Sequence, residues 1–206
     1  MKFHLSKIMN YICYHEKPKY RLNYPCILVD NNDTSFQDNI ASYGNRYRHL
    51  RGIYNIWKNF DLPDTIGVFQ QKRYMGLNVI PFGFRCVVAD WGLGRTNIRH
   101  QYRICHFIED LELVEKIIGP EFTEYIDLQV MPYFHNMFIF NKLDFCNYCE
   151  FLFNVLEKFE ELSNHIQREG YQEAVCAFLA ERIGSYWISR NISENEIYLT
   201  KTLEVF

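Results

Sequence analysis

Polar oxygen-bearing side chains follow a short apolar run near the start of the chain. The run CILVD, at residues 26–30, is rich in β-forming residues, and the next loop carries Asp33, Asp38 and Asn39. In α/β proteins ligands bind at the carboxyl ends of strands, where such oxygens can hold ribose hydroxyls or a hard divalent cation. The alternative is an ordinary turn, because Asp and Asn favour turns for backbone reasons.

A second candidate is the run Gln70-Gln71-Lys72-Arg73, which follows the apolar run TIGVF at residues 65–69. A bound diphosphate needs its charge neutralised, and Lys72 and Arg73 could do this, since arginine grips phosphate through two parallel hydrogen bonds. Solvated surface charge is the alternative. No Asp-x-Asp sequence follows this run, so we predict no protein metal ligands and favour a metal-independent site, with Mn²⁺ or Mg²⁺ left as the alternative.

A third candidate is the segment HFIED at residues 106–110, in which two adjacent carboxylates follow apolar residues. A carboxylate can act as a general base by taking a proton from a hydroxyl group. Adjacent helical residues point about 100° apart, so only one of the two can face a site, and we select Asp110. The alternative is a helix N-terminal turn, where acids suit the helix dipole.

Three further patterns predict structure rather than chemistry. Cys146 and Cys149 lie within an apolar helical stripe with no second cysteine pair nearby, so we expect them to pack in the core. His100 and His106 match no standard zinc spacing, and the Gly-Leu-Gly at 92–94 is too short for a phosphate-binding fingerprint.

Apolar runs that alternate with helical periodicity indicate how these residues are positioned. Strands are expected at 10–14, 26–30, 65–69, 84–89 and 135–141, a loop at 91–94, and helices at 46–59, 97–118, 145–159 and 171–186. Gly119-Pro120 is expected to end the second helix. This order predicts an α/β fold with a mainly parallel, Rossmann-like sheet flanked by helices, in a single domain spanning residues 1–206.

Composition excludes several classes of protein. With 48% hydrophobic and 23% charged residues in 206, the chain can bury a sizeable core. A net charge of −3 argues against nucleic-acid binding. Seven cysteines spread singly, no long apolar stretch and no signal-peptide pattern predict a reduced, cytoplasmic protein.

Ordered sequence blocks resemble a bacterial glycosyltransferase family of capsular and surface polysaccharide synthesis, domain of unknown function 4422. The blocks are DNIAS (38–42), HLRGIYNIWKN (49–59), IGVFQQKRYM (66–75), HFIEDLEL (106–113), HNMFIF (135–140), YCEFLFNVL (148–156) and FLAERI (178–183). They occur in the order of the family pattern and cover most of the chain.

The resemblance implies a GT-A-like fold and transfer of a sugar, a hexose or galactofuranose, from a nucleotide-diphosphate sugar to a growing capsular, O-antigen or exopolysaccharide chain. The acceptor would be an oligosaccharide or lipid-linked glycan, reached at the inner face of the cytoplasmic membrane through other assembly proteins. The site residues that it implies are Arg73 and Asp110 for catalysis, Asp33, Asp38, Asn39, Lys72 and Arg73 for the donor, and His106, His135, Asn136 and Glu181 for the acceptor or pocket.

The chain also departs from the family pattern. Gln70-Gln71-Lys72-Arg73 stands where the family has His-Tyr-Arg-Arg, and His49 stands where it has Glu. The alternative function is therefore a catalytically degenerate member that binds glycans or nucleotide sugars as an assembly scaffold.

Overall fold

The computed structural model describes residues 9–17, 26–75, 77, 80–90, 96–129, 133, 135–163 and 165–204. Its strands are β1 (Met9–Tyr14), β2 (Cys26–Asp30), β3 (Thr65–Gln70), β4 (Arg73–Met75), β5 (Cys86–Asp90), β6 (Phe138–Asn141) and β7 (Ile197–Glu204). Its α-helices are α1 (Leu50–Asn59), α2 (Ile98–Cys105), α3 (Ile108–Ile118), α4 (Pro120–Leu128), α5 (Lys142–Ser163) and α6 (Val175–Asn191). Short 3₁₀ helices are η1 (Ala41–Arg46), η2 (Gly170–Ala174) and η3 (Glu194–Glu196).

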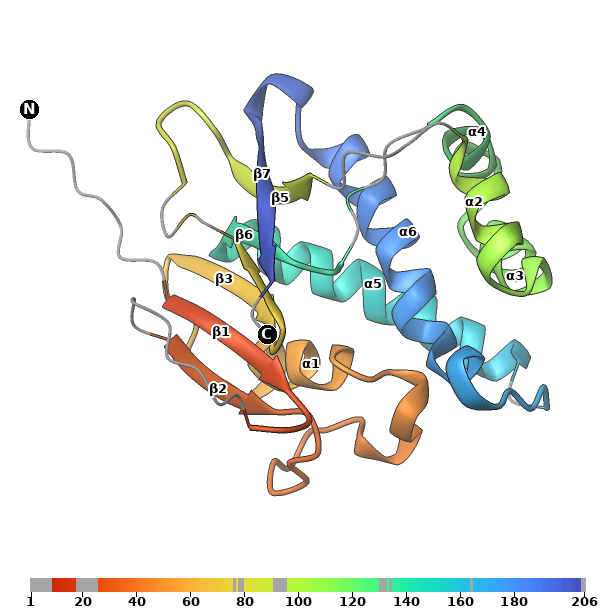
Figure 1. The fold of residues 1–206 in the computed structure, drawn as a ribbon, viewed down its shortest axis with the longest axis horizontal. Coiled ribbons are helices and arrows are strands. Elements are labelled where there is room, and N and C mark those ends of the chain that lie inside the picture. Colours follow the sequence, from red (N-terminus) through yellow and green to blue (C-terminus); the bar gives the residue numbers. More distant parts are fainter. Residues whose placement is uncertain are drawn as a thin grey trace, which may run out of the picture.

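The strands form one sheet in the order β2-β1-β3-β4-β7-β5-β6, with an additional β3–β6 pairing. The parallel pairs β1–β2, β1–β3 and β5–β7 each align five residues. The antiparallel pairs, which involve β4 or β6, align four residues or fewer. Helices flank this sheet (Figure 1), which confirms the predicted α/β fold with a mainly parallel sheet.

Successive strand residues contribute to two different cores. Cys86 and Val88 of β5 pack with the helices in the large core, whereas Val87 and Ala89 belong to a smaller cluster. The smaller cluster gathers Ile12, Phe69, Met75, Val87, Ala89, Met137 and Ile139. This alternation follows from the two-residue period of a strand, and it fixes the register of every strand that carries a site residue at its end.

The five strands β3, β4, β7, β5 and β6 pair in a closed circuit. β3 pairs with β4, β4 with β7, β7 with β5, β5 with β6, and β6 returns to β3. β6 therefore lies beside β3, and the segment that precedes β6 is held against the end of β3.

Helix α1 approaches the ends of β1 and β2 closely. A Cβ at Gly52 would lie 2.5 Å from Asn31 Oδ1 and 2.7 Å from Cys13 Sγ, so this contact requires glycine. α5 packs against α1, β3, β6 and α6, and α2, α3 and α4 form a group beyond α6 (Figure 1). The residues before α1 are thereby brought to the carboxyl ends of the first strands.

Several expected elements differ in their bounds. The helix expected at 97–118 is two helices, α2 and α3, which are separated at His106 and Phe107. Asn97 caps α2, since its side-chain oxygen accepts the backbone N–H of His100 at 2.8 Å. Gly119-Pro120 ends α3 as expected, but Pro120 also begins α4, which was not predicted. β4 and β7 were also not predicted.

Other expectations agree more closely. The strand 26–30 has the expected bounds, and 65–69 extends by one residue. Cys149 on α5 is fully buried in the core, as expected, whereas Cys146 is half-buried and lies outside the core clusters. The expected loop 91–94, with its Gly-Leu-Gly, lies outside the described residues.

Candidate functional site

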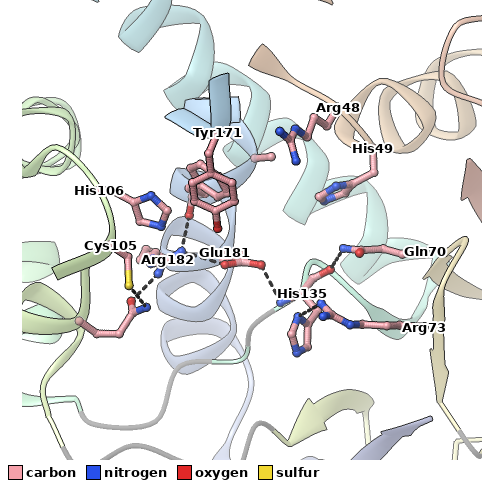
Figure 2. A pocket seen from close by; sticks show the side chains of 13 residues that line it. Arg48, His49, Gln70, Arg73, Cys105, His106, His135, Tyr171, Glu181 and Arg182 are labelled. Atoms are coloured by element: carbon pink, nitrogen blue, oxygen red, sulfur yellow. Dashed lines mark hydrogen bonds and ion pairs between the residues drawn. The ribbon is translucent and has the colours of Figure 1, made fainter. Parts of the chain in front are cut away.

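A cavity of about 520 Å³ opens where α6, α2, η2 and the ends of β3 and β4 meet. Figure 2 shows its two sides, with α6 between them. We call one side the sheet wall, formed by Arg48, His49, Gln70, Arg73 and His135. The other is the aromatic wall, formed by Gln101, Cys105, His106, Tyr171 and Phe178, and the floor is formed by Ala177, Glu181 and Arg182.

His135 is the centre of the sheet wall and is held from three directions. The Gln70 side-chain amide donates to its carbonyl oxygen, and Glu181 Oε1 accepts its backbone N–H at 3.0 Å. Arg73 Nη1 lies 3.0 Å from its Nδ1. Because a guanidinium can only donate, His135 Nδ1 accepts and the ring proton is on Nε2.

The backbone at His135 and Asn136 is left-handed, with φ of 79° and 48°. Such conformations are costly for non-glycine residues and concentrate at functional sites. Asn136 is buried and donates its amide to Ala177 O at 3.0 Å and to His49 Nε2 at 3.1 Å. Burial, together with the nearby Arg48 guanidinium, lowers the pKa of His49 to about 4, so its ring is neutral.

Glu181 and Arg182 form the polar floor of the cavity. The Glu181 side chain is 19% exposed, and its Oε2 accepts from Arg182 Nη1 at 2.8 Å. Burial raises the pKa of Glu181, opposed by Arg182, the His135 N–H and Arg73. A carboxylate with a raised pKa inside a cavity is a candidate proton acceptor.

The aromatic wall is built around His106. Its ring stacks on Phe178, with centroids 4.1 Å apart, and on Tyr171 at 5.9 Å. Its Nδ1 lies 3.2 Å from Gln172 Oε1. Burial and Arg182 lower the pKa of His106 to about 4, so the ring is neutral at physiological pH.

A second cavity of about 490 Å³ lies at the carboxyl ends of β1 and β2. It is lined by His15, Glu16, Asn31, Asn32, Asn45, Arg48 and Arg51. Arg51 Nη2 donates to Asn32 Oδ1 at 2.9 Å, and Gln71 Oε1 accepts the backbone N–H groups of His15 and Glu16 at 2.9 and 3.2 Å. The Gln70–Arg73 segment therefore organises both cavities, with Gln71 serving this one.

Arg48 lines both cavities. It precedes α1 with a left-handed φ of 44°, and its side chain is exposed. Its guanidinium makes no hydrogen bond or ion pair within the described part of the chain. An arginine in this position is available to an anion that spans the two cavities.

The predicted site residues fall into two groups. Arg73, His106, His135 and Glu181 line the large cavity, and Asn136 lies directly behind it on His49. Asp33, Asp38, Asn39, Lys72 and Asp110 line neither cavity. Of these, Lys72 is exposed to solvent between β3 and β4, while its neighbour Arg73 faces the cavity.

Asp110, selected from sequence as a base, lies buried on α3 and is bound to Arg168. Arg168 Nε donates to Asp110 Oδ2 at 2.9 Å, and Arg168 Nη2 pairs with Oδ1. Both carboxylate oxygens are thus engaged away from the cavity, which favours a structural role for Asp110.

The acidic loop also makes internal contacts. Asp33 Oδ1 accepts the Ser35 N–H at 2.8 Å, and hydrogen bonds from the Ser35 hydroxyl and backbone N–H lower the pKa of Asp33. Asp38 Oδ1 accepts from Tyr54 at 2.8 Å, and Asn39 Oδ1 accepts the Ala41 N–H at 3.0 Å. These contacts match the turn alternative, while Asn31 and Asn32 of the same loop line the second cavity.

Sequence reasoning missed Arg48, His49 and Tyr171 as cavity residues. The available signal was the arginine-rich stretch at 46–51 directly after the acidic loop. The described residues contain no group of three or more His, Cys, Asp or Glu side chains that could hold a metal ion. No described helix is long and apolar enough to cross a membrane.

The fold places the chain in a class of α/β proteins that includes a known glycosyltransferase structure. It is similar to the apo structure of the bifunctional glycosyltransferase WbbM, with a TM-score of 0.74 and 20% sequence identity. The similarity covers 96% of this chain and 45% of the WbbM chain, so this chain spans less than half the length of that relative. At this identity the likeness is one of fold.

The chain belongs to the family described as domain of unknown function (DUF4422), whose match covers residues 83–192, more than half of its 206 residues. That match includes α6 and the aromatic wall of the cavity. No curated protein matches the chain in sequence.

Proposed function

We propose that this protein is a glycosyltransferase that moves a sugar from a nucleotide-diphosphate sugar to a glycan acceptor. The observation that carries the proposal is Arg48, which lines both cavities, of about 520 and 490 Å³, and whose guanidinium has no hydrogen bond or ion pair with the residues that the structure describes. A sugar nucleotide has two bulky ends joined by a dianionic diphosphate, and a shared arginine matches that arrangement.

The nucleoside is assigned to the second cavity. This cavity lies at the carboxyl ends of the parallel strands β1 and β2, where ligands of open α/β sheets bind. It offers the amides of Asn31, Asn32 and Asn45, together with His15 and Glu16, as hydrogen-bonding groups for ribose and base. The transferred sugar then lies in the large cavity, beyond Arg48.

The transfer step forms a bond between an acceptor hydroxyl oxygen and the anomeric carbon of the donor sugar. The bond from that carbon to the β-phosphate oxygen breaks, the nucleoside diphosphate leaves with the bonding electrons, and the hydroxyl proton passes to a base. The leaving group gains negative charge, so Arg48 and Arg73 on the sheet wall would stabilise the transition state electrostatically.

Glu181 is assigned as the base in place of Asp110. It is the carboxylate that lines the large cavity, and burial raises its pKa. Its backbone and side-chain partners, the His135 N–H and Arg182, hold it in one orientation between the two walls. A positioned base of this kind contributes roughly 10²–10⁴-fold to a rate.

Membership of the family and the WbbM-like fold support this proposal. A hexose or galactofuranose donor, a capsular, O-antigen or exopolysaccharide acceptor, and a position at the inner face of the cytoplasmic membrane are parts of the proposal. Metal-independent transfer is also proposed, with the charge of the diphosphate met by arginines.

A second candidate function is glycan or nucleotide-sugar binding without transfer. One observation favours it: both oxygens of Glu181 already accept hydrogen bonds, from His135 and Arg182. Binding would then persist while turnover would be absent.

Two measurements on the full chain test the proposal. A thermal-shift screen of sugar nucleotides, each with and without Mn²⁺, tests binding, because a ligand at about 100 times its dissociation constant stabilises the fold by roughly 2.7 kcal/mol. Slow hydrolysis of the bound sugar nucleotide without acceptor tests the chemistry. Transfer predicts both, the scaffold alternative predicts a shift without hydrolysis, and no shift with any sugar nucleotide would refute the proposal.

A matched pair of variants locates the diphosphate. Arg48→Ala should weaken sugar-nucleotide binding by about tenfold or more, since a charge-assisted hydrogen bond is lost. Lys72→Ala is the control, because Lys72 is exposed and lines neither cavity. Equal losses in both variants would show a diffuse charge effect and remove Arg48 from the site.

A further inference from the structure

We infer that the aromatic wall is the acceptor subsite: Tyr171 stacks on one face of a neutral sugar unit, and His106 Nε2 accepts a hydrogen bond from one of its hydroxyl groups. That the bound sugar is the acceptor rests on the proposed function, but sugar binding at the aromatic wall can be tested by itself. Neither Tyr171 nor a role for Nε2 follows from the family match.

Tyr171 provides an exposed aromatic surface at the cavity. Its ring is 61% exposed although it lines the cavity from η2. It is supported from behind by Phe178 at 4.8 Å between centroids and by His106 at 5.9 Å. An aromatic ring that is fixed on one side and open on the other suits the C–H face of a sugar ring.

The hydrogen bonds of Gln172 determine the tautomer of His106. Gln172 Nε2 donates to the Cys105 carbonyl at 2.8 Å, so Gln172 Oε1 is the atom that faces His106 Nδ1. His106 Nδ1 must then carry the proton and donate to Oε1. Because one ring face is stacked on Phe178 and Nδ1 is engaged, His106 presents its Nε2 lone pair as a hydrogen-bond acceptor.

This wall is preordered by contacts that lie outside the cavity. The loop before η2 is anchored by the buried ion pair of Arg168 with Asp110 on α3. Gln172 fastens η2 to the end of α2. Tyr171 and His106 therefore keep their relative positions without a ligand, which reduces the entropy lost on binding.

The position of the aromatic wall in the large cavity suits it to bind the acceptor sugar rather than the donor sugar. Arg48, which connects to the second cavity, is on the opposite side of the large cavity, and Glu181 lies on the floor between the two walls (Figure 2). A sugar on Tyr171 would thus lie across Glu181 from the donor. Uncharged hydroxyl groups fit His106, because its ring is neutral and its Nε2 can accept a hydrogen bond.

Saturation-transfer NMR with the full chain and methyl glycosides of common hexoses, in pyranose and furanose forms, tests the wall directly. We expect at least one glycoside to receive saturation on the C–H groups of one ring face. Tyr171→Phe should keep this signal, because the ring remains. Tyr171→Ala should lose it, and His106→Phe, which keeps the stack but removes Nε2, should weaken affinity by about tenfold.

The result that overturns the inference is equal glycoside binding in wild type and Tyr171→Ala, or no binding of any glycoside to wild type. The sugar-nucleotide thermal shift serves as the separate readout, and it should be unchanged in all three variants. If no sugar nucleotide binds while the glycoside result is as expected, the transferase proposal fails and the wall stands as a glycan-binding site. If sugar nucleotides bind but glycosides do not depend on Tyr171, only the inference fails.

Discussion

Asp110 and Glu181 are both carboxylates paired with an arginine, yet their surroundings differ. Asp110 is 2% exposed, meets Arg168 with both oxygens and lines neither cavity. Glu181 divides its oxygens between a backbone N–H and Arg182, and its side chain is 19% exposed on the floor of the large cavity. The comparison teaches that a buried acid is a candidate base only where a reacting group can reach it.

The largest expected effect is on turnover at Glu181. Glu181→Gln keeps an oxygen for the His135 N–H but removes the proton acceptor, so sugar transfer should fall by roughly 10²–10⁴-fold. Sugar-nucleotide binding, measured by thermal shift, should change little. Near-normal turnover in this variant would exclude Glu181 as the base. An equal loss of turnover in Asp110→Asn would show that the two carboxylates do not differ in their role.

Asp110 should instead show its effect in stability. Asp110→Ala leaves the Arg168 guanidinium, with a side chain only 3% exposed, buried without its partner. Urea unfolding should show a loss of about 3–5 kcal/mol. The control is Asp110→Ala with Arg168→Met, which should recover most of the loss, because no uncompensated charge remains. A single variant as stable as wild type would contradict the structural assignment.

Low pH should also distinguish the cavity from the Asp110 region, because His49 in the sheet wall makes stability depend on pH. The folded pKa of His49 is about 4, below its ordinary value of 6.5, so the unfolded chain binds more protons between these values. Its contribution to stability is present above the ordinary value and is lost as pH falls toward about 4, by about 1–3 kcal/mol.

Urea unfolding between about pH 7 and pH 4.5 should therefore show a shallower fall for His49→Gln than for wild type. The Asp110→Ala variant should keep the wild-type slope in this titration, since His49 is unchanged in it. Identical slopes for wild type and His49→Gln would show that His49 does not titrate in this way.

The last expected effect concerns Gly52, which packs against Asn31 of the second cavity. A Cβ there would press on Asn31 and Cys13, so Gly52→Ala should move α1 and cost about 1–3 kcal/mol. Binding of sugar nucleotides should weaken, whereas glycoside binding at the aromatic wall should not. A thermal-shift titration with both ligands checks this, and weakening of both would show that the two cavities are not independent.

Much of the fold follows from local patterns, and the exceptions have physical causes. The apolar runs at 26–30 and 65–69 predict β2 and β3, because buried parallel strands are continuously apolar. β4 has three residues and β7 carries mixed polarity, so neither has a recognisable period. At the break, His106 and Phe107 are extended, and His106 contacts Gln172, 66 residues away, which no local window contains.

The site was predicted only in part for the same reason. Arg73, His106, His135 and Glu181 were found through ordered motifs, and they do line the cavity. Arg48 was not, because its exposed side chain and left-handed backbone carry no sequence signal other than neighbouring arginines. Asp110 and Asp38 were selected for their carboxylates, but their partners Arg168 and Tyr54 are known only once the chain is folded.

The closed circuit of strands has a consequence for how the chain is made. β7, at 197–204, is the segment that joins β4 to β5, and its partners lie more than a hundred residues earlier. While a ribosome is still adding those residues, β4 and β5 keep unpaired edges that neighbouring nascent chains can join. Such distant pairing also slows folding, because the entropy of closing a long loop is lost before the stabilising contacts form. The edges of β4 and β5 are therefore open to such pairing until the synthesis of β7 is complete.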